Sequence, residues 1–84
     1  MFTQTDVDMI VNELPSSAIM EISEKTGISR PTVYRFFNGV KIRSSLQERI
    51  YVAALKIIER DRNRSQKIKD ERDRILNHNP RSDK

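Results

Sequence analysis

The chain contains neither glycine nor proline between Val40 and Pro80, and this absence constrains its fold more than any other feature. A stretch without those two residues can continue as one helix, because nothing in it breaks the backbone hydrogen-bonding pattern. The segment Ser45-Leu46-Gln47-Glu48 has the spacing of a capping box at a helix start. We therefore expect a helix that starts at Ser45 and can continue to about Asn77. Asn63-Arg64-Ser65 is the expected position of a break, and a solvated, fraying tail is the favoured state of the residues that follow the domain.

The first residues predict a short helix with one apolar face. Four aliphatic residues recur at the i, i+3, i+4 and i+7 spacing of such a face, namely Val7, Ile10, Val11 and Leu14. Thr5 and Asp8 have the spacing of an N-terminal capping pair, and Pro15 is expected to stop the helix.

Two further short helices are expected, joined by a glycine. The first, at about 17–26, directs Ile19 and Ile22 inward and ends at Gly27, because glycine adopts the left-handed conformation without a Cβ clash. Ser29 caps the next helix, which ends at Asn38-Gly39. The inward face of that helix consists of Val33, Phe36 and Phe37.

Length and composition allow one small all-α domain. Only 36% of the 84 residues are hydrophobic, against about 45–50% in average globular proteins. We expect a compact four-helix domain over residues 1–58, with a long C-terminal helix extending from it. Residues 59–84 are expected to form a charged helical extension or tail, solvated and frayed at its end and a candidate for oligomerisation. The chain has no cysteine, which excludes disulfides and thiolate zinc sites. It also has no apolar run long enough for a membrane span.

The fourth helix is expected to have apolar residues on two opposite sides. One stripe, formed by Leu46, Ile50, Ala53, Ala54 and Ile57, can pack on the first three helices. The second stripe consists of Tyr51, Leu55 and Ile58, and it lacks a partner in so small a domain. We therefore expect these three residues to form a homodimer surface.

The positive charge is concentrated in one part of the chain. The whole sequence has 16 Lys and Arg against 12 Asp and Glu, a formal net charge of +4. Between Lys25 and Gln47, however, there are five basic residues and no acidic one: Lys25, Arg30, Arg35, Lys41 and Arg43. Such a window indicates a surface that contacts phosphate, although chance clustering on a solvated face would look the same.

Two short helices joined by a glycine-containing turn, the second with exposed arginines, describe a helix-turn-helix. The segment EISEKTGISRPTVYRFFNG resembles the reader unit of the lac repressor family. The residues that match the pattern of that family are Gly27, Ile28, Ser29, Thr32, Val33, Arg35 and Asn38. The preceding helix and the short chain are similar to the lambda repressor and Cro fold, and GISRPTVYRFF also resembles the DNA-binding segment of serine recombinases. The resemblance covers about residues 17–58 and implies double-stranded DNA as partner.

The expected outer face of the third helix carries the candidates for base reading: Arg30, Pro31, Tyr34 and Arg35. In a helix-turn-helix, the N-terminal end of this helix enters the major groove. Arg30 and Arg35 are candidates for bidentate contact with guanine. Pro31 stands where lac-type readers often place a polar side chain, and it offers only apolar contact, for example to a thymine methyl. Tyr34 is a candidate for a base edge or a phosphate, or for packing its ring on a neighbour.

Five other residues are candidates for contact with the DNA backbone: Ser29, Thr32, Asn38, Lys41 and Arg43. Ser29 and Thr32 stand near a helix N-terminus, which favours phosphate, and the family resemblance implies the same role. The others flank the C-terminal end of the helix, where they can hold phosphate but cannot specify sequence.

Nothing in the sequence indicates an enzyme, a cofactor or a metal site. The only histidine, His78, has no acid cluster or cysteine near it in sequence. Acid pairs such as Asp70 and Asp73 fall on a charged helix without an apolar pocket to raise a pKa. Both glycines are expected at helix ends, so no phosphate-binding glycine loop exists.

These features predict a sequence-specific DNA-binding regulator, a repressor of bacterial or phage type that acts as a homodimer through the fourth helix. Such a protein is expected in the cytoplasm on the nucleoid, without a membrane or small-molecule effector as partner. An alternative is a DNA-packaging protein similar to a small terminase subunit, or a recombination accessory protein, in which a helix-turn-helix joins an oligomerising helix. A third possibility is a module that binds an acidic protein through the basic window.

Overall fold

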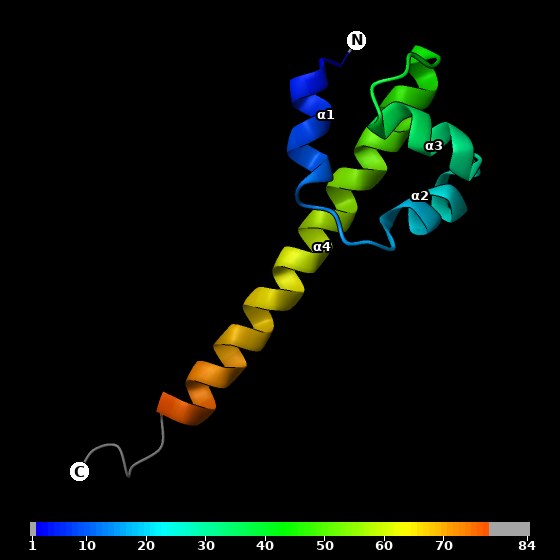
Figure 1. Cartoon of the computed structure of the whole chain (residues 1–84). Coiled ribbons are helices and arrows are strands. Elements are labelled where there is room, and N and C mark those ends of the chain that lie inside the picture. Colours follow the sequence, from blue (N-terminus) through cyan, green and yellow to red (C-terminus); the bar gives the residue numbers. More distant parts are fainter. Residues whose placement is uncertain (1, 78–84) are drawn as a thin grey trace.

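The computed structural model describes residues 2–77, and all regular structure in them is helical. The helices are α1 (Gln4–Val11), α2 (Ala18–Thr26), α3 (Arg30–Phe37) and α4 (Ser44–Asn77). Figure 1 shows the three short helices gathered around the first half of α4, while its second half projects away from them. The expected all-α class, with a four-helix unit and a long C-terminal helix, is confirmed. Because of the projection, the radius of gyration is 17.9 Å, against about 12 Å for a compact domain of this length.

The start of α1 differs from the predicted one. Thr3, not Thr5, is the N-cap: its hydroxyl accepts a hydrogen bond from the Asp6 amide at 3.1 Å, and the Asp6 carboxylate accepts one from the Thr3 amide at 3.0 Å. Asp8 instead accepts a hydrogen bond from the Gln4 side chain at 2.9 Å. Both threonines have an aspartate three positions later, so the sequence offers two equivalent capping pairs and the prediction chose the wrong one.

The core lies between α4 and the short helices. The side chains that are most completely enclosed are Ile22 of α2, Val33 of α3, and Ile50 and Ile57 of α4. Val7 and Ile10 of α1 close the core from the other side. The predicted face is wrong at Val11, which is exposed, and α1 ends at Val11, so Leu14 and Pro15 lie beyond the helix. The inward-facing residues predicted for the second, third and fourth helices are buried or half-buried, as expected.

The second apolar stripe of α4 is largely covered within the chain. The ring of Phe2 stacks on Tyr51 with centroids 4.3 Å apart, and it meets Phe36 edge to face at 6.0 Å. Ile58 is only 8% exposed, while Leu55 remains 45% exposed. The expectation that this stripe has no partner is therefore wrong for Tyr51 and Ile58. The sequence pattern did not assign Phe2 to the core, because it precedes the first helix.

The start of α4 also differs from expectation, whereas its end agrees. The helix begins at Ser44, so Ser45 lies inside its first turn and is not the N-cap. Gln47 holds the start of the helix instead. Its backbone amide donates to the Arg43 carbonyl at 2.9 Å, and its buried side-chain amide donates to the Ile42 carbonyl at 2.7 Å. The helix then runs to Asn77, the farthest end that the absence of glycine and proline allows. The expected break at 63–65 and the expected fraying of the tail are wrong over the described residues, because the helical hydrogen bonds continue through them.

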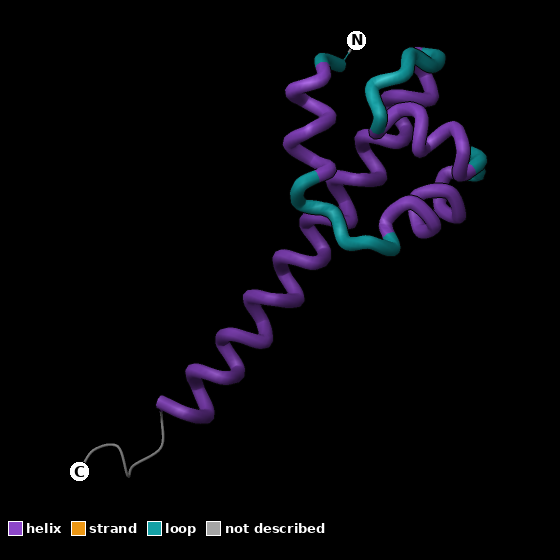
Figure 2. Tube along the Cα trace, in the orientation of Figure 1, coloured by secondary structure: helices purple, strands orange, loops and turns teal. Residues whose placement is uncertain are grey.

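Two ion pairs mark where α4 leaves the other helices. Arg60 contacts Glu21 of α2, and Arg62 lies 3.0 Å from Glu13 in the connection between α1 and α2. Every residue from 63 to 77 is exposed. We call residues 2–62 the body and residues 63–77 the extension; Figure 2 shows the extension as one uninterrupted helix. The predicted boundary at 58 lies one turn before the last of these contacts. The predicted unstructured end of the tail, with His78, lies outside the described residues.

Candidate nucleic-acid interface

The turn between α2 and α3 is fixed by local hydrogen bonds. Gly27 ends α2 in the left-handed region (φ 76°), as predicted, and its amide donates to the Ser23 carbonyl at 2.9 Å. The Thr26 hydroxyl donates to the Ile22 carbonyl at 2.7 Å and accepts from the Ile28 amide at 3.2 Å. The backbone at the turn is thereby paired on both sides of the glycine, and the direction of α3 relative to α2 is set.

A side chain from α4 also holds this turn. The Arg49 guanidinium donates a hydrogen bond to the Thr26 carbonyl at the C-terminal end of α2. A cation at this end of a helix is favourable because the last carbonyls carry partial negative charge. Sequence reasoning missed this contact, since Arg49 is one of many charged residues on α4 and only the packing of α2 against α4 brings it to Thr26.

The N-terminal end of α3 has no side-chain cap, and the amides of Thr32 and Val33 both donate to the Ser29 carbonyl at 3.1 Å. Ser29 is the N-cap residue, as predicted, yet its hydroxyl is bonded to the Thr32 hydroxyl at 2.9 Å and makes no capping bond to the backbone. Pro31 lies in the first turn, where its missing N–H leaves no gap in the helix. Two hydroxyls and one apolar ring therefore stand together at this end.

The helix α3 has one buried and one exposed face. Val33 and Phe36 are buried and Phe37 is half-buried, so these aromatic rings belong to the core. All four candidates for base reading, Arg30, Pro31, Tyr34 and Arg35, are exposed, and Asn38 continues the same face. Thr32 is half-buried and lies at the border between the faces. At 100° per residue, the exposed positions span an arc of about 140°, wide enough to be presented to a groove as a unit.

The C-terminal end of α3 determines where the remaining candidates stand. Gly39 has φ 85°, the Val40 amide donates to the Arg35 carbonyl at 2.8 Å, and the Gly39 amide donates to the Phe36 carbonyl at 3.1 Å. These two bonds form a Schellman motif. The chain turns sharply here, so the exposed residues Lys41 and Arg43 follow directly after the C-terminal end of the exposed face of α3.

The basic residues of this surface are free of acidic partners. Six ion pairs occur among the described residues, and none of them includes Arg30, Arg35, Lys41 or Arg43. Three acids of the body form ion pairs elsewhere: Glu21 with Arg60 and Lys25, Asp61 with Arg60, and Glu13 with Arg62. The α3 surface and the loop after it therefore present uncompensated positive charge, the electrostatic condition for contact with phosphate.

The Glu21–Arg60 pair braces the two-helix unit against α4. Two side-chain hydrogen bonds join the guanidinium to the carboxylate, one of them 3.2 Å long. The hydrogen bond from Arg60 holds the pKa of Glu21 below its ordinary value, and the same bond raises the pKa of Arg60. No sequence signal singles out this pair, because the two residues lie on separate helices.

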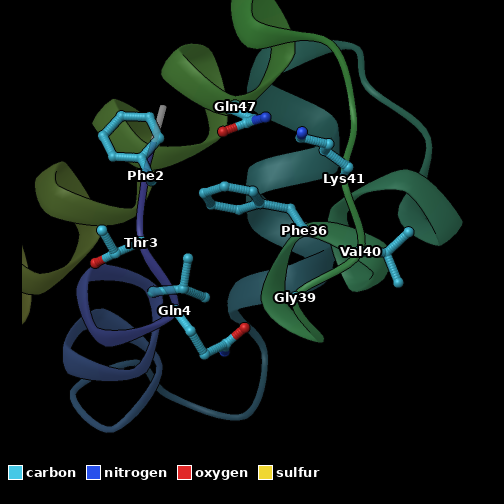
Figure 3. Close-up of a pocket in the computed structure, with 9 residues that line it drawn as sticks. Phe2, Thr3, Gln4, Phe36, Gly39, Val40, Lys41 and Gln47 are labelled. Atoms are coloured by element: carbon cyan, nitrogen blue, oxygen red, sulfur yellow. The ribbon is translucent and has the colours of Figure 1, made fainter.

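A small pocket lies beside the C-terminal end of α3. Its volume is about 310 Å³, and Figure 3 shows Phe36 at its centre, Lys41 and Gln47 on one side and Gln4 on the other. Gly39 lines it as well, and a Cβ there would collide with the Gln4 side chain. The start of α1 and the basic loop therefore line the same pocket from opposite sides.

The described residues contain neither a metal-binding cluster nor a membrane-spanning segment. In residues 2–77, no three His, Cys, Asp or Glu side chains are grouped so that they could hold a metal ion. None of the described helices combines the length and apolar character needed to cross a membrane.

Comparison of the chain with protein-family models, with curated proteins and with solved structures finds no match.

Proposed function

We propose that the protein is a sequence-specific regulator that binds double-stranded DNA, with α3 in the major groove. The observation that carries the proposal is the outer face of α3, where two unpaired arginines, a tyrosine and a proline are exposed on a helix whose other face is core. An exposed helix face of this size fits the major groove, which is about 12 Å wide.

The roles within the interface follow from position. Arg30 and Arg35 are the proposed guanine readers, Tyr34 contacts a base edge or phosphate, and Pro31 contacts a thymine methyl. Ser29 and Thr32 at one end of α3, and Asn38, Lys41 and Arg43 at the other, are the proposed phosphate contacts. With contacts at both ends, the helix is held in one register along the groove.

The proposed regulator is a repressor of bacterial or phage type, cytoplasmic and associated with the nucleoid. It acts as a homodimer through α4, because two reader helices related by a two-fold axis address a pseudo-palindromic site. It needs no cofactor, and its control is expected to come from expression level, a partner protein or proteolysis.

Selection of bound sites from random DNA tests this proposal. We expect a palindromic consensus, and loss of selective binding when Arg35 is replaced by alanine. The matched control is Lys56→Ala, which removes one positive charge from an exposed position of α4 away from the α3 face. Selection without any consensus, or an Arg35→Ala variant with unchanged affinity for the selected site, would overturn the base-reading proposal.

A second candidate is favoured by the projecting α4. In a DNA-packaging protein of the small-terminase type, a helix-turn-helix is joined to an oligomerising helix within a ring. The mass of the protein in solution discriminates between the two: a dimer supports the regulator, and a ring of many copies supports the packaging role. Binding to an acidic protein, with no preference for any DNA sequence, would indicate instead a protein-interaction module that uses the basic window.

A further inference from the structure

The core-facing stripe of α4 continues along the extension after the body has ended. Ala54 is buried in the body, and Asp61, Ile68 and Ile75 follow it at intervals of seven. Seven residues fall only about 20° short of two full turns, so these positions lie nearly above one another. The helix side that is packed in the body is therefore the side on which the extension carries its isoleucines.

All large aliphatic side chains of the extension lie on this one side. Ile68, Ile75 and Leu76 are 62%, 56% and 59% exposed, and at 100° per residue they fall within an arc of about 100°. Ser65 and Arg72 complete the same side. We call this set the 61–76 stripe: Asp61, Ser65, Ile68, Arg72, Ile75 and Leu76. A one-sided apolar stripe on a projecting helix indicates a surface that is covered in the functional state.

We infer that the 61–76 stripe binds a second copy of itself in antiparallel orientation, with the two-fold axis between Gln66 and Lys67. In this register, Asp61 faces Arg72 of the second copy and Arg72 faces its Asp61. Arg64, on the flank of the stripe, likewise comes beside Glu71 of the other copy. Two ion pairs, each repeated by the two-fold axis, thus form across it. Within one chain, Asp61, Glu71 and Arg72 contact only their near neighbours Arg60, Arg74 and Asp73, so the pairs across the axis add to exposed local ones.

The same register satisfies the apolar residues. Ile68 faces the small Ser65 of the second copy near the axis. Ile75 and Leu76 come level with Ile58, which lies one turn before the end of the body and has only 8% of its surface exposed. A groove of about 400 Å³ is present at that point, lined by Ile58, Asp61 and Ser65 together with polar neighbours. The C-terminal end of one extension can therefore lie in this groove, at the junction of body and extension in the other copy.

The charges disfavour a parallel pair. In parallel register, identical residues meet, so Asp61 would face Asp61 and Arg72 would face Arg72, while Arg64 would approach Lys69. The antiparallel pair has one kind of unfavourable approach, Lys69 to Arg62 of the other copy, which the two-fold axis repeats once. Glu13 lies 3.0 Å from Arg62 and compensates that charge.

This inference refines the homodimer of the proposed function and moves its surface from Tyr51, Leu55 and Ile58 to the 61–76 stripe. It does not depend on DNA binding. Its failure is read from mass and distance measurements without DNA, whereas failure of the proposed function is read from the Arg35→Ala binding experiment.

Sedimentation equilibrium of the full chain is the first test. We expect twice the chain mass of 9.9 kDa, and the chain mass alone for the Ile68→Lys/Ile75→Lys double variant. The matched control is Val52→Lys, which places a charge on an exposed aliphatic position on the opposite side of α4. A wild type that stays monomeric, a double variant that remains dimeric, or a ring of many copies would overturn the inference.

A charge exchange tests the register. We expect Asp61→Arg and Arg72→Asp to weaken dimerisation at least tenfold each, and the double exchange to restore it. Circular dichroism would verify that the single variants retain their helices. Failure of the double exchange to restore the dimer, with both helices intact, contradicts the proposed pairing.

A spin-label distance tests the orientation directly, since the chain has no native cysteine. With a label on Asn77→Cys, the antiparallel pair places the two labelled positions about 30 Å apart along the axis, at ~1.5 Å per residue. A parallel pair would place them about 10 Å apart, the usual distance between packed helices. The short distance would rule out the antiparallel arrangement.

Discussion

Glu21 on α2 and Arg60 on α4 are joined by two side-chain hydrogen bonds across 39 positions of sequence. The pair connects the first helix of the proposed reader unit to α4 where α4 leaves the body. The bond from Arg60 is the main cause of the lowered pKa of Glu21, while desolvation acts in the opposite direction. The stability of this connection therefore depends on pH.

We expect Glu21→Gln to lower stability at neutral pH and to have no effect in acid. A carboxylate with a lowered pKa in the folded state contributes stability above its unfolded pKa of about 4.3, and this contribution is lost as pH falls through the folded value. Urea unfolding between pH 7 and pH 3 measures the difference. Glu24→Gln, at an exposed position of the same helix, is the control. A difference from wild type that stays constant with pH would show that the pair contributes nothing through ionisation.

We expect Ile57→Ala to destabilise the protein by about 2–5 kcal/mol, because it leaves a cavity where α4 packs on the short helices. The side chain of Ile57 is almost completely buried, whereas Ile75 in the extension is exposed. Ile75→Ala is therefore expected to change the stability of the monomeric body by less than about 0.5 kcal/mol. Equal losses in denaturant unfolding of a dilute sample would contradict the assignment of the core.

We expect Gly27→Ala to lower the free energy of unfolding, measured with denaturant, by about 1–2 kcal/mol, the penalty for a Cβ in the left-handed region. No atom lies within 4 Å of a Cβ built at this position, so the cost comes from the backbone conformation alone. Gly27→Asn is expected to cost less, because asparagine tolerates this region better than alanine does. If alanine and asparagine were equally destabilising, a steric cause would have to replace the conformational one.

Arg35→Ala and Lys41→Ala are expected to affect DNA binding differently. Arg35→Ala removes a base contact, which weakens the binding free energy at the selected site by about 1–3 kcal/mol and relaxes the sequence preference there. Loss of a phosphate contact weakens binding uniformly and reduces the slope of log K against log salt by about 1. Fluorescence anisotropy over a salt series, on specific and unrelated duplexes, separates the two patterns. If Lys41→Ala weakened binding only to the selected sequence, Lys41 would be a base contact and the proposed phosphate role would be wrong.

The periodic and conformational signals in the sequence predicted most of the helices correctly. Gly27 and Gly39 both adopt positive φ at helix ends, as their positions indicate. The end of α4 at Asn77 agrees with the run without glycine or proline. Among the wrong predictions are the helix starts at Thr3 and Ser44, where several residues can cap equally well and packing selects among them.

The candidate site was predictable in part. The arginines of α3 were expected on the face opposite Val33 and Phe36, and they lie there because helix geometry fixes that relation. The contacts that hold the unit in place were not predictable. Arg49 reaches Thr26, and Arg60 reaches Glu21, only because α4 packs beside α2.

The sequence by itself determined the helical class, the glycine turns and the side of α3 that carries the basic residues, because each depends on neighbours within a few positions. The tertiary structure alone decided that Phe2 covers Tyr51 and that the body ends at Arg62. Both depend on side chains that are distant in sequence and meet only after collapse of the core. That collapse leaves the extension, with Ile68 and Ile75, without a neighbour from its own chain among the described residues.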